Sequence, residues 1–263
     1  MTTLLADTLT LTRRHYAHLR AQPGRLVAIV AFPVIMVVLF AYVFGSAITL
    51  PGGGNYKEFL MPGIFVQMLA LSATNTATEV ADDMGKGIID RFRSLPVARA
   101  SILLGRTLAE VSGRCLGLAS MVGCGMLLAG WRPHRGVAHT AAAFGLLVLF
   151  GFATTWLGTF VGLSVRSPAT ADAAIFSWMM PLTFLANTFV PTRGLPFWLR
   201  PLADWNPMSA TVTACRQLFG NPSPPTVHSG AWPLYHPVAV SLAWTVALGG
   251  VFLPLAVRRY RRV

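Results

Sequence analysis

Residues 82–106, DDMGKGIIDRFRSLPVARASILLGR, form a charged island between two long apolar segments. The stretch holds five of the 21 lysine and arginine residues and three of the nine acidic ones, although only 11% of the chain is charged. As helices, the flanking segments 59–79 and 107–131 are long enough to cross roughly 30 Å of hydrocarbon. The stretch is therefore expected to be a loop between two membrane spans, and the rest of the chain is arranged around it.

Composition places the chain among helical membrane proteins. Of its 263 residues, 54% are hydrophobic, whereas a soluble domain of this length exposes more polar surface. The net charge of +12 comes from cations at the edges of apolar runs, which is typical of membrane proteins rather than of nucleic-acid-binding proteins. We expect residues 1–263 to form one all-α polytopic membrane domain.

Six segments are apolar and long enough to be transmembrane helices. The expected spans are residues 26–48, 59–79, 107–131, 137–164, 173–191 and 236–257. Pro181 is expected to interrupt the fifth span. Residues 1–24 carry leucines on one helical face with arginines beside them, so we expect an amphipathic helix along the cytoplasmic membrane surface. The alternative is a solvated basic tail.

Residues 193–235 are too polar for a span and too rich in helix signals for a plain loop. Asn206-Pro207 is a typical helix start and Gly220 a typical stop, so a helix is expected over 207–219. A shorter helix is expected before it, over 196–203. Tryptophans in this region suit a membrane–water interface. We expect a re-entrant helical hairpin in the outer leaflet.

The positive charges assign the two sides of the membrane. Six spans place both termini on one side, together with residues 82–106 and the turn after the fourth span. That side holds fourteen lysine and arginine residues; the other holds Lys57, Arg132, Arg135, Arg193, Arg200 and Arg216. Because cytoplasmic loops carry the positive excess, both termini are expected in the cytoplasm, with the chain in a bacterial inner or plasma membrane.

The charged island is expected to begin with a short helix. Met84, Ile88 and Phe92 recur every four residues and form an apolar stripe that a groove in another protein can accept. The alternative is that the stripe packs on the chain's own spans. Pro96 ends the helix, because the residue before a proline disfavours helical backbone. This expected coupling helix comprises Met84, Gly85, Lys86, Gly87, Ile88, Ile89, Asp90, Arg91 and Phe92.

Arg106, Glu110 and Arg114 form a row of charges at the start of the third span. Their spacing of four residues places them on one helical face, so that Glu110 can pair with both arginines. Charge inside a membrane is costly and often functional, but arginines near the edge can extend to the surface. Two roles stay open, namely anchoring at the membrane edge and a direct part in coupling or transport.

Two glycine pairs are expected to allow close packing of helices. Gly113 with Gly117, and Gly158 with Gly162, have the GxxxG spacing that lets two backbones approach each other. Packing is the role expected of all four glycines.

The sequence contains none of the motifs that mark nucleotide binding or catalysis. GxxxxGK[ST], HExxH and GxSxG do not occur in it, and the three cysteines form no CxxC. His134 and His139 have no carboxylate or cysteine near them in sequence. We therefore expect no catalytic residue, metal site or cofactor in this chain, which has the character of a passive part driven by another protein.

Two regions carry a resemblance to a known family. Residues 90–106, DRFRSLPVARASILLGR, place an acid-arginine pair before Leu-Pro-Val and then Leu-Leu-Gly-Arg. Residues 181–216, PLTFLANTFVPTRGLPFWLRPLADWNPMSATVTACR, contain FVP, LPFWLR, NP and a later arginine. With the span count and both tails, these resemble the ABC-2-type transporter permeases, particularly daunorubicin and doxorubicin resistance exporters. Asp90 departs from the commoner glutamate but keeps the charge.

The resemblance implies a function for the charged island. Two six-span permease chains, homo- or heterodimeric, would each be served by a separate cytoplasmic ATPase that binds ATP and Mg²⁺. The coupling helix would fit a groove in that ATPase, and ATP-driven closure would expel a hydrophobic drug or lipid-like molecule. Two alternatives are a polysaccharide or glycolipid exporter of the same architecture, and a membrane scaffold or lipid-acting enzyme that needs no ATPase.

Overall fold

The structure is a computed structural model that describes residues 31, 34–44, 54–86, 99–189, 195–223 and 232–262. Within these ranges the chain is helical and contains no strand. The helices run in the order η1 (Leu39–Phe44), α4 (Tyr56–Gly85), α6 (Arg99–Leu128), α7 (Val137–Gly162), α8 (Pro168–Leu185), α9 (Arg200–Asp204), α10 (Pro207–Phe219), α11 (Trp232–Tyr235) and α12 (Pro237–Arg262).

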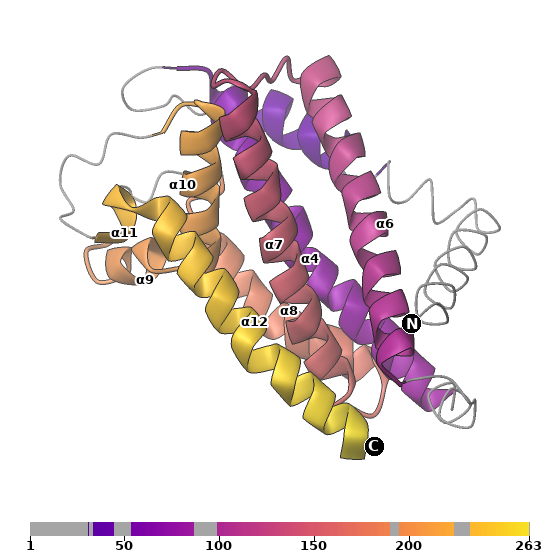
Figure 1. Ribbon diagram of the computed structural model, residues 1–263. Helices are drawn as coiled ribbons and strands as arrows, with labels where there is room; N and C mark the ends of the chain where they lie inside the picture. Colours follow the sequence, from indigo (N-terminus) through magenta and orange to yellow (C-terminus); the bar gives the residue numbers. More distant parts are fainter. Residues whose placement is uncertain are drawn as a thin grey trace.

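Helix α4 is the centre of the bundle. It packs most extensively on α7 and also contacts α8, α10, α6 and η1, and α12 covers the other side of α7 (Figure 1). The side chains of α4 from Phe59 to Val66 are all buried. The main hydrophobic cluster joins them to Leu147 and Phe150 of α7 and to Phe219 of α10. The core therefore lies around the first half of α4.

Among the described residues, three helices are long and apolar enough to cross a membrane by length and composition. These are α4, α7 and residues Pro237–Tyr260 of α12. The segments Val34–Val43 and Cys115–Leu128 are shorter apolar helices. They fall inside the predicted first and third spans, and α8 falls on the fifth. The described residues thus give a helical membrane-type protein with three clear spanning candidates.

Several helix ends differ from the predicted ones. Helix α4 continues past residue 79 to Gly85 because its polar last turns keep the helical hydrogen bonds. The helix is capped by Lys86, whose backbone amide donates to Asp82 O and Met84 O. Helix α6 begins at Arg99, eight residues earlier than predicted. Helix α8 begins at Pro168, where the Ser167 side chain accepts from the Thr170 amide, and it continues through Pro181 to Leu185. The predicted interruption at Pro181 is wrong.

The predicted helix over 207–219 is confirmed residue for residue as α10. Asn206 Oδ1 accepts from the Met208 amide at 2.8 Å, and Pro207 occupies the first turn. Gly220 ends the helix with φ at 74°, a left-handed conformation that favours glycine. The predicted helix over 196–203 is a turn followed by α9, whose bounds are Arg200–Asp204.

Replacing Asn206 by alanine is expected to lower the stability of the folded chain by about 2 kcal/mol. The side chain is buried and serves two elements, because it caps α10 and its Nδ2 donates to Leu182 O of α8 at 2.7 Å. A cap and a buried hydrogen bond each contribute about 1 kcal/mol. Thermal unfolding of the purified protein measures the change. The exposed Asn75, replaced by alanine, is the control, and an equal effect there would contradict the role of Asn206.

Candidate functional site

The bundle has two ends of different character. At the tail end lie the last turns of α4, α7 and α12 (Figure 1). At the hairpin end lie α10, the first turn of α4 and the loop 131–136 (Figure 1). Residues 82–85, the first of the charged island, form the last turn of α4 at the tail end, whereas α10 of the predicted hairpin lies at the opposite end (Figure 1). Helix α4 is thus one continuous element that reaches both.

At the tail end, a small apolar cluster joins three helices. Val80 of α4, Trp156 of α7 and Ala256 of α12 are buried together with Leu163, which follows α7. Met84 packs against this cluster and is partly buried. The first residue of the predicted coupling stripe therefore contacts the chain's own helices, as in the alternative in which this segment packs on the spans.

Of the predicted coupling helix, Met84, Gly85 and Lys86 lie in the described residues; residues 87–92 lie outside them. Met84 and Gly85 belong to the last turn of α4 rather than to a separate helix. Lys86 Nζ donates to Asp82 Oδ2 at 2.5 Å on the exposed surface. The hydrogen bond with Asp82 and then the charge of that carboxylate raise the pKa of Lys86 above its usual value, so the Lys86 ammonium is charged at neutral pH.

The predicted row of charges lies on a single uninterrupted helix. Arg106, Glu110 and Arg114 all belong to α6, and the helical backbone keeps their spacing of four residues. Their side chains fall outside the described part of the structure, so the pairing of Glu110 with its neighbours stays a prediction.

The two predicted glycine pairs differ in their surroundings. A Cβ on Gly158 of α7 would overlap Ala73 O of α4, and one on Gly162 would lie 2.5 Å from Ala77 O. Gly113 of α6, in contrast, has no described atom within 4 Å of the place that a Cβ would take, and Gly117 O accepts from Ser120 Oγ of the same helix at 2.8 Å. Two further glycines outside these pairs also allow a close approach. A Cβ on Gly63 would lie 2.5 Å from Thr188 O, and a Cβ on Gly125 would overlap the Met61 side chain.

At the hairpin end, Arg216 of α10 is completely buried. Its Nε donates to Phe59 O of α4 at 2.9 Å. Its Nη2 donates to Asn187 O at 2.9 Å and Thr188 O at 3.1 Å, in the turn that follows α8. The guanidinium also lies 3.5 Å from the centre of the Phe59 ring. One side chain therefore joins three elements, and all of its described hydrogen-bond acceptors are neutral carbonyls.

Three polar atoms around Arg216 have no hydrogen-bond partner in the described part of the chain. They are Arg216 Nη1, Asn187 Oδ1 and Thr188 Oγ1, all buried. Sequence reasoning missed this role of Arg216, which it counted among the cations outside the membrane. Every residue of α10 from Met208 to Arg216 is buried, and a charge buried in this way requires partners.

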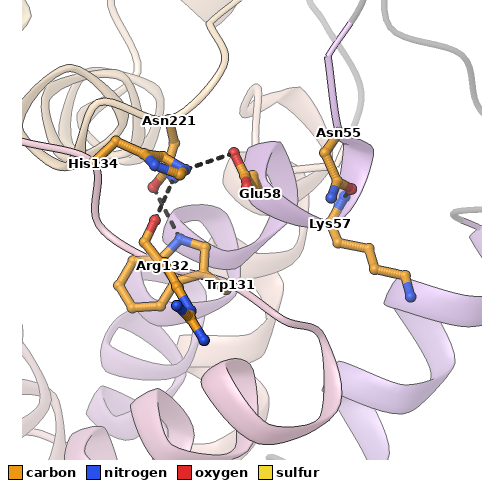
Figure 2. Close-up of polar contacts among 7 residues, drawn as sticks. All are labelled: Asn55, Lys57, Glu58, Trp131, Arg132, His134 and Asn221. Carbon is orange, nitrogen blue, oxygen red and sulfur yellow. Dashed lines mark hydrogen bonds and ion pairs between the residues drawn. The ribbon is translucent and has the colours of Figure 1, made fainter.

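The loop between α6 and α7 is fastened to both α4 and α10. His134 Nε2 lies 3.0 Å from Glu58 Oε2 of α4, and the Trp131 indole donates to Asn221 Oδ1 at 2.9 Å (Figure 2). Asn221 Nδ2 donates to Arg132 O, and the His134 amide donates to Phe219 O. His134 thus has a carboxylate neighbour that its sequence surroundings did not reveal. Within the described residues no three metal-ligating side chains come together.

Comparison with known proteins covers most of the chain. Residues 6–219 match the family described as ABC-2 type transporter. The "Daunorubicin resistance ABC transporter permease protein DrrB1" of Streptomyces coeruleorubidus is 32% identical over 98% of this chain and 87% of its own length. The "Doxorubicin resistance ABC transporter permease protein DrrB" of Mycobacterium tuberculosis is 26% identical over 85% of this chain and 78% of its own. The "Putative transport permease ycf38" of Cyanophora paradoxa is 22% identical over 83% and 76%.

Proposed function

Because the chain belongs to the ABC-2 type transporter family, we propose that it is the permease subunit of an ATP-binding-cassette exporter for a hydrophobic drug or lipid-like molecule. The observation that carries the proposal is the similarity, over nearly the whole chain, to permeases named for daunorubicin and doxorubicin resistance. The chain would move its substrate out of the cytoplasm or the inner leaflet of a bacterial cell membrane and would carry no catalytic residue itself.

The proposed machine contains four chains. Two permease chains, identical or different, form the membrane part, and two cytoplasmic ATPase subunits bind ATP and Mg²⁺. The absence of a GxxxxGK[ST] loop from the sequence supports a separate source of ATP hydrolysis. The family membership supports the same division of labour.

The proposed topology has six spans with both termini in the cytoplasm. The three long apolar helices α4, α7 and α12 support the second, fourth and sixth spans. The excess of lysine and arginine on the tail side supports the orientation. Exposed tryptophans at 198, 205 and 232 support an interfacial position for the hairpin in the outer leaflet.

The ATPase is proposed to act on the coupling residues 84–92, at the end of α4. Helix α4 supports this assignment because it runs without a break from the hairpin end to Gly85. Since a helix rises about 1.5 Å per residue, α4 is long enough to connect the two ends of the bundle. A displacement of its last turn would therefore be carried along α4 to the hairpin end. The charges Arg106, Glu110 and Arg114 are proposed to anchor or guide α6, the next helix after the coupling residues.

Exchanging the two charges Asp90 and Arg91, as Asp90→Arg/Arg91→Asp, is expected to break the contact with the ATPase. A contact between charged surfaces depends on the placement of each charge, and opposing like charges disfavour it. Co-purification of the ATPase with the permease is expected to fall about tenfold, which corresponds to about 1.4 kcal/mol. The control Arg132→Glu alters an exposed charge at the hairpin end. Unchanged co-purification and unchanged ATP-dependent export would contradict the coupling assignment.

A further inference from the structure

The contacts of Arg216 divide between α4, which the proposed ATPase would displace, and the turn that follows α8. Phe59 O belongs to α4, the helix whose other end leads into the coupling residues. Asn187 O and Thr188 O belong to the turn that ends α8. If the last turn of α4 is displaced by an ATPase, the distance between these two sets of acceptors changes. Arg216, which belongs to α10, donates to both sets of acceptors, so a change in the distance between them alters its hydrogen bonds.

The turn after α8 offers Arg216 an additional acceptor. Thr188 Oγ1 is buried without a partner in the described chain, as is Arg216 Nη1, although Nη2 of the same guanidinium already contacts Thr188 O. The Thr188 side chain is confined by α4, because its Cγ2 lies only 2.9 Å from the position that a Cβ on Gly63 would take. A shift of α4 away from the turn frees this side chain to adopt another staggered rotamer.

We propose that Arg216 is a positioning residue that exchanges partners during export. In the present arrangement it holds Phe59 O of α4; when α4 is displaced, it releases Phe59 O and Nη1 pairs with the hydroxyl of Thr188. Three features of the arrangement suit a two-state element. A donor of Arg216 and an acceptor of Thr188 both lack a partner in the described chain, and the two residues are already in contact through Nη2 and Thr188 O. The released carbonyl of Phe59 retains the helical amide four residues on, and a buried charge is kept hydrogen-bonded in both states. The inference rests on the proposed function, because it requires an ATPase that moves α4.

Two substitutions of Thr188 separate the hydroxyl from the shape of the side chain. Thr188→Val keeps the shape and removes Oγ1, whereas Thr188→Ser keeps Oγ1 and removes the methyl group. If the hydroxyl had no function, its removal from a buried site without a partner would be neutral or stabilising. The control Thr74→Val removes another buried hydroxyl without a partner in the described chain, on α4 and away from Arg216.

The assay uses inside-out membrane vesicles that contain the full chain and its ATPase, with doxorubicin as a fluorescent probe. We expect Thr188→Val to assemble with the ATPase as the wild type does, but to accumulate doxorubicin about tenfold more slowly, because the second state loses a hydrogen bond to a charged group. Thr188→Ser and Thr74→Val are expected to stay within about twofold of the wild-type rate.

Each other result overturns a definite part of the inference. Wild-type export by Thr188→Val, or an equal loss with Thr188→Ser, would show that the hydroxyl is not an exchange partner. Failure of Thr188→Val to assemble, with Thr188→Ser intact, would show that the hydroxyl is already bonded in the resting state. If the wild-type chain itself gave no ATP-dependent accumulation of doxorubicin while assembled with its ATPase, the proposed drug export would fail, and this inference would fail with it.

Discussion

Replacing Gly158 by leucine is expected to prevent α4 and α7 from packing and to leave little correctly folded protein. A Cβ at this position would overlap Ala73 O and would lie 3.1 Å from Thr76 Cβ of α4. The nearest atom belongs to the backbone, so it cannot move aside as the end of a side chain does. Overpacking a core costs about 1–3 kcal/mol and sometimes more, and a leucine adds three further carbons. We expect a loss of at least about 3 kcal/mol.

The measurement is the thermal unfolding temperature of purified protein, together with the fraction that elutes as a single species. Gly145 offers a matched control on the same helix, because nothing lies within 4 Å of the Cβ position there among the described residues. Gly145→Leu is expected to fold normally. If Gly158→Leu unfolded at the wild-type temperature, the close contact of α4 with α7 would be contradicted.

The second large effect is expected from Arg216→Met. Methionine fills much of the space but donates no hydrogen bond, so the buried carbonyls of Asn187 and Thr188 lose their donor from Arg216. Each buried acceptor left unpaired costs about 1–3 kcal/mol, and the contact with the Phe59 ring contributes up to about 2 kcal/mol more when desolvated. Removing the cation also relieves its desolvation cost, which opposes these losses. We expect the losses to dominate, by about 3 kcal/mol, because two buried carbonyls lose their donor at about 1–3 kcal/mol each.

Arg216→Lys separates the charge from the geometry of the guanidinium. Lysine keeps the positive charge, but its single ammonium cannot contact α4 and the turn after α8 in the same planar arrangement. An intermediate loss of stability is therefore expected. Arg132→Met is the control, because Arg132 is exposed. Thermal unfolding of the three variants tests the series. Wild-type stability of Arg216→Met would contradict the claim that Arg216 stabilises the fold by joining α10 to α4 and to the turn after α8.

Local signals in the sequence were sufficient for some elements. Helix α10 could be predicted to the residue because residues at its two ends determine where it begins and ends. Asn206-Pro207 starts the helix and Gly220 ends it. The ends of α4 and α6 could not be predicted in the same way. Polar residues such as Asp82 mark the end of an apolar stretch, but they do not end a helix, since they form helical hydrogen bonds as well as apolar residues do.

The candidate site depended on contacts between distant residues. Arg216 meets Phe59, which lies 157 positions away, and His134 meets Glu58 across 76 positions. No spacing rule within one helix reports such pairs. The two glycine pairs also share one motif but differ in their contacts. A Cβ on Gly158 or Gly162 would meet the backbone of α4, whereas a Cβ on Gly113 would meet no described atom.

The central claim is that this chain is the passive membrane part of an exporter driven by a separate ATPase. The most direct measurement is doxorubicin accumulation in inside-out vesicles that contain the permease alone, the ATPase alone, or both. We predict accumulation that requires ATP and both chains, and its loss when the ATPase cannot hydrolyse ATP. Accumulation by the permease alone, or none when the assembled pair hydrolyses ATP, would contradict the claim.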